Sequence, residues 1–441
     1  MIETAPKFEF SNQINDIKFL DVLRAIEIPE FDKIEEDYPY WDKVKYIPIP
    51  THYQISKKDF SKKLWITLKT KRHLRNISYN FSDAFNFKYN IDNHLQQKLH
   101  YLDFNFGTGI QKEKLLSDID KHRYLTNALM EESIFSSMIE GATTTRVKAK
   151  EMLRKSKKPA NKSEQMILNN YKTIQYISAH QNEEITVAKL FEIHNLVTEN
   201  TLDKKDCGIF RTSDDVMVMN QITGEIIHIP PSFEKLDDMM VSLCNFFNIN
   251  SKDNFIHPIV KASIVHFLIG YIHPFADGNG RTARALFYWY LLKNGYWLTE
   301  FLSISRVILK TKTQYEKALI YTEIDEMDVT YFIQYQVKVL TRAFEDLKTY
   351  ISTKKKDEDK LSKYLKLSGV NERQAQILYW IEENQNRCFT VKEIETIFNV
   401  TNQTARTDIE ELVEKEFLKK LPINKKSFNY WKGENFSKIY L

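Results

Sequence analysis

Hydrophobic side chains recur every three or four residues along most of the chain after about residue 110, which predicts a mainly α-helical protein. An apolar run at 264–272 and a run rich in Ala, Leu and aromatic residues at 282–292 indicate two helices with a short glycine-containing loop between them. The other helices that we expect in this region cover residues 113–137, 161–178, 186–199, 310–321 and 328–350.

Residues 215–230 break this helical pattern. Two runs rich in β-branched and other apolar residues lie on either side of a Thr223-Gly224 turn, which is typical of a β-hairpin. The edge of such a hairpin can hold an extended segment of another chain by β-augmentation, and a surface hairpin without a binding role is the alternative.

The two ends of the chain differ from this centre. Residues 1–110 are rich in aromatic side chains, and we expect them to be irregular apart from some extended segments and a helix at 57–75. A charged linker at 354–360 follows the helical domain at 111–350 and leads to a separate domain at 361–441. The last domain has the layout of a winged helix-turn-helix, with helices expected at 371–383, 390–398 and 402–418 and a β-wing at 419–431.

Charge is unevenly distributed, although the net charge of the 441 residues is only +4. Residues 57–75 carry a local +7 and residues 415–441 a local +5, and runs of this kind are more often solvated faces than binding sites. Gln403, Thr404 and Arg406 of the expected recognition helix would face a DNA groove. The same helix carries acidic residues that oppose DNA, so a protein partner remains the alternative: Asp408, Glu410, Glu411 and Glu414.

The composition also bears on the compartment. The chain has three cysteines at no metal-binding or redox spacing, which fits a reducing cytoplasm. Glu3 and Pro6 lie where a signal peptide would be apolar, and no apolar run approaches the roughly 18 residues that span a bilayer. We therefore expect a cytoplasmic protein with no membrane partner.

The loop between the two central helices concentrates polar chemistry. Gly278 and Gly280 lie at the entry to the second helix, where exposed backbone N–H groups and the helix dipole favour an anion. Arg281 and Arg284 lie three residues apart and can bind phosphate oxygens. These features predict a phosphate-binding loop.

Two side chains of this loop suit nucleotide chemistry. Asp277 suits Mg²⁺, which binds few carboxylates and bridges substrate phosphates. His273 precedes the anion site and can take a proton from a hydroxyl group. A zinc site built from His257, His266 and His273 is an alternative, although no closing Cys or Glu lies at a useful spacing.

The residues from His273 to Arg284 match the signature of the Fic family at every defined position. The resemblance implies a helical fold and an enzyme that transfers AMP from ATP, with Mg²⁺, to a Ser, Thr or Tyr hydroxyl of a protein, the chain itself included. It implies that His273 is the general base and Asp277 the Mg²⁺ ligand. Asn279 and its backbone neighbours would hold the α-phosphate, Arg281 and Arg284 the outer phosphates, and Phe275 would pack.

Three further features extend the resemblance. The segment from Gly208 to Arg211 matches the lead-in to the family's hairpin flap, and Tyr315 lies where the family often places an aromatic residue near adenine. Gly278 favours nucleotidyl transfer, because the phosphate-transferring branch has a larger residue there. Transfer of another nucleotide or of a phosphate-containing group is one alternative, and a DNA-binding regulator with a secondary Fic core is another.

A second motif resembles the inhibitory helix of the family. Ser136 and Glu140 lie four residues apart, on one face of a helix, and Gly141 ends that helix. The resemblance implies that Glu140 pairs with Arg284 and keeps this arginine from the γ-phosphate of ATP, so the enzyme would be autoinhibited.

Overall fold

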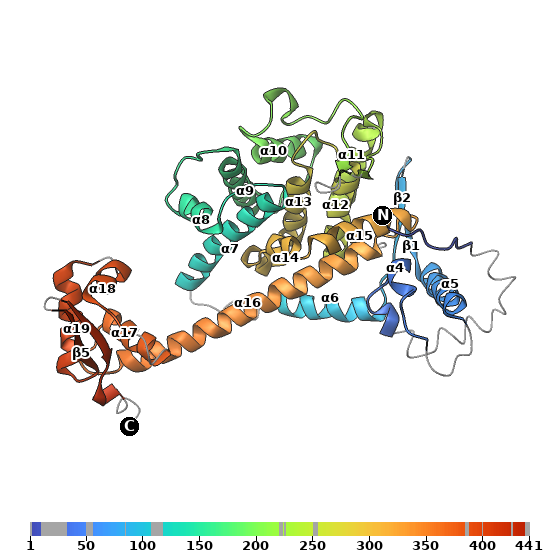
Figure 1. Cartoon of the computed structure of the whole chain (residues 1–441). Helices are drawn as coiled ribbons and strands as arrows, with labels where there is room; N and C mark the ends of the chain where they lie inside the picture. The colour runs from blue at the N-terminus through green and yellow to red at the C-terminus, as the bar shows by residue number, and fades with distance from the viewer. Residues whose placement is uncertain are drawn as a thin grey trace. The chain divides into compact units, whose positions relative to one another are not determined.

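The computed structural model describes residues 2–9, 33–49, 56–83, 85–106, 118–219, 224, 226–249, 255–383, 388–398, 400–424 and 427–436. Most of these residues are helical, as the hydrophobic spacing predicts (Figure 1). The chain divides into two compact units, residues 1–345 and 346–441. Among the described residues, no helix is both long and apolar enough to span a membrane.

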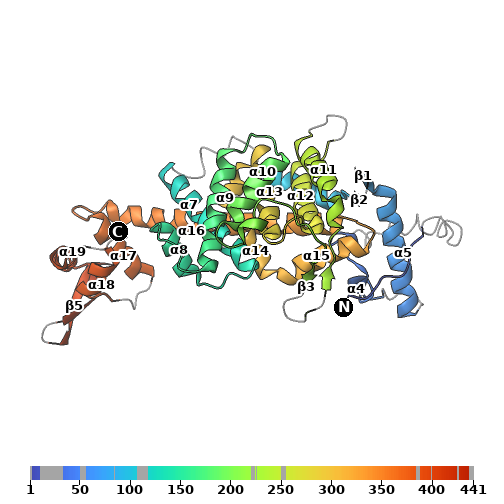
Figure 2. The same cartoon turned by 90° about the horizontal axis from the view of Figure 1, so that it is seen from above.

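The first unit is built around helices α12 (Pro258–Ile272) and α13 (Asn279–Lys293), which pack against each other. Nearly every side chain of both helices is buried, so they form the centre of the unit. Figure 2 shows α13 and α12 between α9 and α11. The surrounding helices are α7 (Asp118–Ile139), α8 (Arg146–Arg154), α9 (Lys162–Ala179), α10 (Val187–Thr198), α11 (Leu236–Asn248), α14 (Ile304–Lys310) and α15 (Lys312–Ile324), with short 3-10 turns η2 (Lys204–Asp206), η3 (Phe233–Lys235) and η4 (Trp297–Phe301).

The predicted hairpin is present. Strand β3 (Val218–Met219) pairs antiparallel with β4 (Ile226–His228), and Gly224 adopts a φ of +69° in the turn. The rest of the turn, residues 220–223 and 225, lies outside the described residues.

The expectation of an irregular N-terminal region was wrong for much of it. Helix α5 (Lys57–Arg75) is the one we predicted, but α4 (Trp41–Val44), the antiparallel strands β1 (Ile77–Ser82) and β2 (Phe85–Tyr89) and helix α6 (Asn93–Phe106) are also present. Aromatic rings on these strands pack against α11: the ring centroids of Tyr79 and Phe246 lie 5.0 Å apart. The aromatic residues of this region therefore belong to the core of the first unit.

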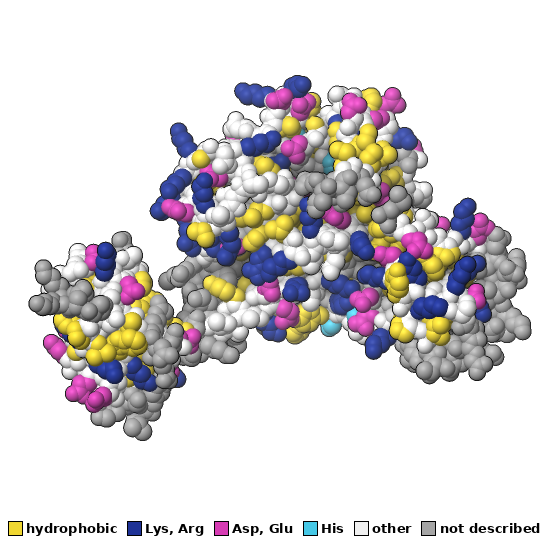
Figure 3. All heavy atoms as spheres, in the orientation of Figure 1, with side chains coloured by type: hydrophobic (Ala, Val, Ile, Leu, Met, Phe, Trp, Pro, Cys, Tyr) yellow, Lys and Arg dark blue, Asp and Glu magenta, His cyan; other side chains and the backbone are white. Residues whose placement is uncertain are grey.

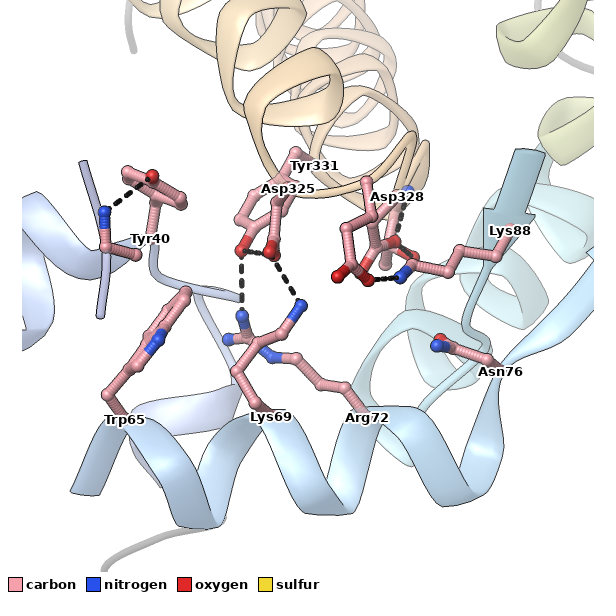
Figure 4. A network of polar contacts seen from close by, with 12 residues as sticks. Tyr40, Trp65, Lys69, Arg72, Asn76, Lys88, Asp325, Asp328 and Tyr331 are labelled. Carbon is pink, nitrogen blue, oxygen red and sulfur yellow. Dashed lines mark hydrogen bonds and ion pairs between the residues drawn. The ribbon is translucent and has the colours of Figure 1, made fainter. Parts of the chain in front are cut away.

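The basic run on α5 is only partly a solvated face. Lys69 and Arg72 are buried, at 4% and 1% exposure. Lys69 binds Asp325 at 2.6 Å (Figure 4), and Arg72 binds Glu35 at 2.7 Å. On the face of the molecule drawn in Figure 3, the Lys and Arg side chains of the described residues lie interspersed with Asp and Glu. Two cations of this run are therefore buried in ion pairs that link α5 to the rest of the first unit.

The predicted charged linker is helical. Helix α16 (Thr330–Leu365) runs through residues 354–360 without a break. The run at 354–360 carries both signs of charge and contains no Pro or Gly, the residues that usually end a helix. Charge alone therefore did not indicate where this helix ends.

The second unit has the predicted winged-helix layout. Helices α17 (Glu372–Glu383), α18 (Val391–Phe398) and α19 (Asn402–Glu414) pack around one apolar core, and β5 (Leu418–Asn424) pairs with β6 (Ser427–Lys432) as the wing. Helix α19 ends four residues earlier than expected, because Leu418 already pairs with Lys432 in the wing.

Candidate active site

The site begins where α12 ends. His273 has left-handed backbone angles, φ +49° and ψ +57°, and its N–H donates to the Ile269 carbonyl. Arg211 supports this turn twice: its Nε donates to the His273 carbonyl at 3.1 Å, and its backbone N–H donates to the Pro274 carbonyl at 2.9 Å. The arginine of the Gly208–Arg211 segment therefore fixes the backbone of the expected base.

The His273 ring is set up to accept a proton. Its Nδ1 lies 3.2 Å from the Gly270 carbonyl, which can only accept, so Nδ1 carries the ring proton. That leaves the Nε2 lone pair free of the ring's own proton. Burial lowers the pKa of His273, and the nearby charges of His228 and Arg211 lower it further, so the neutral base is favoured at neutral pH.

The loop after His273 is closed by one side chain. Asn279 accepts from the Phe275 N–H at 2.9 Å and donates from Nδ2 to the Phe275 carbonyl at 2.7 Å. The side chain of Asn279 is thus occupied in shaping the loop, and the backbone rather than this amide is left to face a phosphate. Gly278 has φ +86°, and a Cβ there would lie 3.0 Å from Thr198, so a larger residue would be both strained and crowded.

His194, on α10, supports the same loop and was not identified from the sequence. Its Nε2 donates to the Asp277 carbonyl at 2.9 Å, its Nδ1 accepts from the Gly208 N–H at 2.9 Å, and its ring stacks on Phe275 at 3.9 Å. Burial lowers the pKa of His194, which favours the neutral ring that can donate from one nitrogen and accept at the other. A single histidine in an apolar helix gives no sequence signal for this role.

Arg281 and Arg284 are both 1% exposed. Arg281 donates from Nη1 to the Val197 carbonyl and lies 3.4 Å from Asp277 through Nη2. Arg284 donates from Nε to the Ser136 hydroxyl at 2.8 Å and from Nη2 to Glu140 at 2.9 Å. Within the described part of the chain, Arg281 Nε and Arg284 Nη1 are buried without a hydrogen-bond partner, an arrangement that is costly unless an anion binds.

Glu140 lies against the start of α13. A Cβ atom on Gly280 would lie only 2.1 Å from Glu140 Oε1, so the carboxylate occupies the space beside this glycine. The first turn of a helix is where an anion is stabilised by backbone N–H groups and the helix dipole. Glu140 therefore places a carboxylate at the anion site, and its distance to Arg284 matches the predicted pair.

The end of α7 fixes Glu140 in this position. Gly141 has φ +88°, its N–H donates to the Met138 carbonyl, and the Ala142 N–H donates to the Ser137 carbonyl, which is a Schellman motif. Helix α7 is also attached to α14, because buried Glu132 accepts from the Ser305 N–H at 3.0 Å. Burial raises the pKa of Glu132.

Asp277 is a carboxylate of this loop, with a side chain 46% exposed. Its Oδ1 accepts from the Gly278 N–H at 2.5 Å. The described residues contain no group of three side chains that would hold a metal on their own. One accessible carboxylate fits a Mg²⁺ ion that arrives with substrate phosphates rather than one caged by the protein.

The alternative zinc site is not assembled. His266 accepts from Gln336 and lies 3.1 Å from the Tyr315 hydroxyl, while His257 binds Asp103 at 2.9 Å, so these histidines and His273 have separate partners. Burial lowers the pKa of His266 well below its usual value. Tyr315 contacts His266 of α12 through its hydroxyl, and burial raises the pKa of Tyr315.

The comparisons with known proteins agree with this geometry. Residues 184–291 match the Fic/DOC family and residues 373–427 match an HTH domain family. The chain therefore carries a Fic domain and a helix-turn-helix domain. The Fic match covers helices α10 to α13, the flap and the loop from His273 to Arg284.

Named relatives carry the same core. A protein adenylyltransferase Fic of Nematostella vectensis is 27% identical over 248 residues, which cover 53% of each chain, and one of Aedes aegypti is 33% identical over 220 residues, 47% of this chain and 40% of that one. This chain thus spans about half of those relatives or less. A Fic family protein from Desulfovibrio desulfuricans shares the fold, with a TM-score of 0.51 at 19% identity over 78% of this chain and 98% of that one.

Proposed function

We propose that this protein transfers AMP from ATP to a Ser, Thr or Tyr hydroxyl of a protein, with the chain itself among the candidate targets. One observation carries the proposal: a histidine whose Nε2 is available as a base adjoins a helix start where two buried arginine N–H groups lack partners. A base beside a phosphate-binding site is what nucleotidyl transfer to a hydroxyl requires.

The proposed reaction uses these groups in sequence. His273 Nε2 takes the proton of the target hydroxyl as its oxygen attacks the α-phosphorus of ATP. The bond to the bridging oxygen of the β-phosphate breaks, and pyrophosphate leaves. Arg281 and Arg284 stabilise the charge on the outer phosphates, while Asn279 keeps the loop backbone in place. Asp277 would hold Mg²⁺, which neutralises phosphate charge when it is bound.

Two alternatives concern the group transferred. The resemblance at Gly278 supports nucleotidyl transfer over phosphate transfer, because the phosphate-transferring branch has a larger residue at this position, and a larger residue would be strained and crowded here. Tyr315, whose hydroxyl lies 3.1 Å from His266, is the candidate contact for the nucleotide base.

Autoinhibition is part of the proposal. Glu140 occupies the space beside Gly280 and binds Arg284, so the γ-phosphate of ATP would compete with this carboxylate. Ser136 supports the restrained state, because it accepts from Arg284 through both its hydroxyl and its carbonyl oxygen.

Mass spectrometry of the intact protein after incubation with Mg-ATP tests the chemistry. The Glu140→Gly variant should gain the mass of AMP, and adding His273→Ala should slow this gain by about 10²–10⁴-fold, the usual contribution of a general base. His180→Ala is the matched control, since His180 is a surface histidine stacked on Tyr176. Undiminished labelling by the His273→Ala variant would refute the role of the base.

A second function is proposed for the winged helix, where a specific observation favours DNA over a protein partner. Three of the four carboxylates that oppose DNA are bound internally: Asp408 by Arg373, Glu410 by Lys420, and Glu411 by Gln374. Of the three residues expected to face DNA, Gln403 and Arg406 are exposed on the first turns of α19, whereas Thr404 is half-buried and contacts Thr401. Thr407 is exposed beside them, and side chains of these types read base edges.

Fluorescence anisotropy with the full chain and a random duplex tests this second function. Binding should weaken steeply with added salt, and Arg406→Ala should weaken it further, whereas Lys366→Ala, which removes an exposed cation elsewhere in the unit, should have little effect. No binding at low salt would move the assignment to a protein partner. A DNA-binding regulator with an inactive Fic domain would bind DNA but transfer no AMP.

The cytoplasm is the proposed compartment. Cys207, Cys244 and Cys388 are all free thiols, which suits a reducing environment.

A further inference from the structure

His228, the last residue of the flap strand β4, is bound through both of its ring nitrogens. Its Nε2 lies 2.7 Å from the Tyr271 carbonyl, and its Nδ1 lies 2.8 Å from Glu323 Oε2. The residue is only 7% exposed. A histidine on a hairpin edge needs no such contacts for folding of the hairpin itself, so they serve to attach the flap to its surroundings.

The two partners define where protons lie. A carbonyl oxygen only accepts, so Nε2 carries a hydrogen. A carboxylate also accepts, so the contact between Nδ1 and Glu323 holds only when one proton lies between them, on the ring or on the carboxyl group. The pair is therefore a hydrogen-bonded contact between the flap and helix α15.

The first partner belongs to the end of α12, beside the proposed base. The last carbonyls of a helix lack partners within the helix, and the negative end of its dipole favours cationic donors. His228 donates to the Tyr271 carbonyl, and Arg211 donates to the His273 carbonyl. Arg211 also donates to the Pro231 carbonyl, just beyond β4, so the base of the flap is held on both sides of the end of α12.

The second partner belongs to a helix that the N-terminal region holds. Glu323 lies in the last turn of α15, and Asp42 of the N-terminal region accepts from Lys317 at 3.0 Å and from Tyr321 at 2.6 Å on the same helix. Directly after α15, Asp325 binds Lys69 of α5 and the Tyr331 hydroxyl (Figure 4). Glu323 is thus attached to a helix end with several independent anchors.

We propose that the His228–Glu323 pair positions the flap for the transfer reaction, and that α15, braced by the N-terminal region, provides the fixed point. The proposal rests on the proposed function. His228 and Glu323 are positioning residues: the flap would present the target hydroxyl to His273, whereas the proposed ATP site is the loop from Asp277 to Arg284. The pair should therefore control the use of the protein target and leave nucleotide affinity unchanged.

The test uses the full-length Glu140→Gly protein as the parent, with Mg-ATP and self-labelling as the probe. Glu323→Ala should slow self-labelling at least tenfold and speed hydrogen exchange of the backbone amides at 226–228, with unchanged ATP affinity in calorimetry. Glu323→Gln should restore most of the labelling, because an amide N–H can donate to Nδ1 of a neutral His228. Glu316→Ala is the matched control, since Glu316 is a carboxylate of the same helix that pairs with Lys312.

A double-mutant cycle completes the test. His228→Ala should slow labelling at least as much as Glu323→Ala, because it removes the contact with the Tyr271 carbonyl as well, and the double variant should be no slower than His228→Ala alone. Unchanged exchange and labelling in Glu323→Ala would overturn the proposal, as would fully additive effects. If the parent does not label itself, the proposed function fails, and the exchange rates of the flap amides alone then decide whether the pair holds the flap.

Discussion

The contact between Glu140 and Arg284 makes a strong prediction about activity. Glu140→Gly removes a carboxylate that lies 2.9 Å from Arg284 and against Gly280, in a position that phosphate oxygens of ATP would need. We expect the variant to transfer AMP faster than the wild type, because the nucleotide no longer competes with the protein's own anion.

The size of the effect follows from the geometry. A hydrogen bond to a charged group contributes about 1.5–3 kcal/mol, and the Glu140 side chain is 30% exposed, so we take about 2 kcal/mol. That corresponds to about thirtyfold tighter productive binding of ATP. Arg284 keeps its two contacts with Ser136, so the melting temperature should fall by only a few degrees, as about 1 kcal/mol implies for a domain of this size.

Intact mass measured over time across a range of ATP concentrations is the assay. Glu151→Ala serves as the control, because Glu151 is an exposed carboxylate that pairs with Lys155 and Lys157 on the surface. Adding Arg284→Ala should remove the gain. Equal rates for the Glu140→Gly variant and the wild type at every ATP concentration would show that Glu140 does not restrain the site.

Three further predictions concern pH and stability. Transfer by the Glu140→Gly variant should keep its full rate down to about pH 6.5, the ordinary histidine pKa, and fall only below it, because burial lowers the pKa of His273; an inflection above pH 7 would contradict this. Burial also lowers the pKa of Lys261 to about 8. Below that pH the buried side chain is charged in the folded state, which lowers the free energy of unfolding, and this loss of stability disappears as the pH rises toward 10.5, the ordinary lysine pKa. Lys261→Met should therefore raise the free energy of unfolding by about 2 kcal/mol at pH 7 and by much less at pH 10, as measured by urea denaturation; equal gains at both pH values would exclude this cause. Lys69→Ala should lower the free energy of unfolding by about 3 kcal/mol, because Asp325 stays buried without its cation; a change below about 0.5 kcal/mol would mean that the pair contributes little.

The sequence could point to the loop from His273 to Arg284 because the residues that suggest phosphate binding are consecutive. Glycines, a helix start and two arginines within one short segment have local consequences, and the Ser136–Glu140 motif is local as well. The predicted pairing of Glu140 with Arg284, 144 residues apart, came from the family resemblance, and the structure has that contact.

The supporting residues were invisible because their partners are remote in sequence. His194, His228 and Glu323 act through contacts that span 14 to 95 residues, and nothing in their immediate neighbours indicates these partners. Some extended segments were expected before residue 110, but the positions of β1 and β2 were not predicted, for a related reason. Tyr79 and Phe87 are stabilised by packing on each other and on Phe246, and this context is not available from a short window of sequence.

The position of Glu140 also determines what kind of signal can relieve the restraint. In the proposed autoinhibition, this carboxylate competes with ATP from within the same chain, so its effective concentration at the loop does not change when the protein is diluted. Control then depends on the ATP concentration and on whatever moves the last turn of α7, where the contacts of Gly141, Ala142 and Glu132 set how tightly the competitor is held.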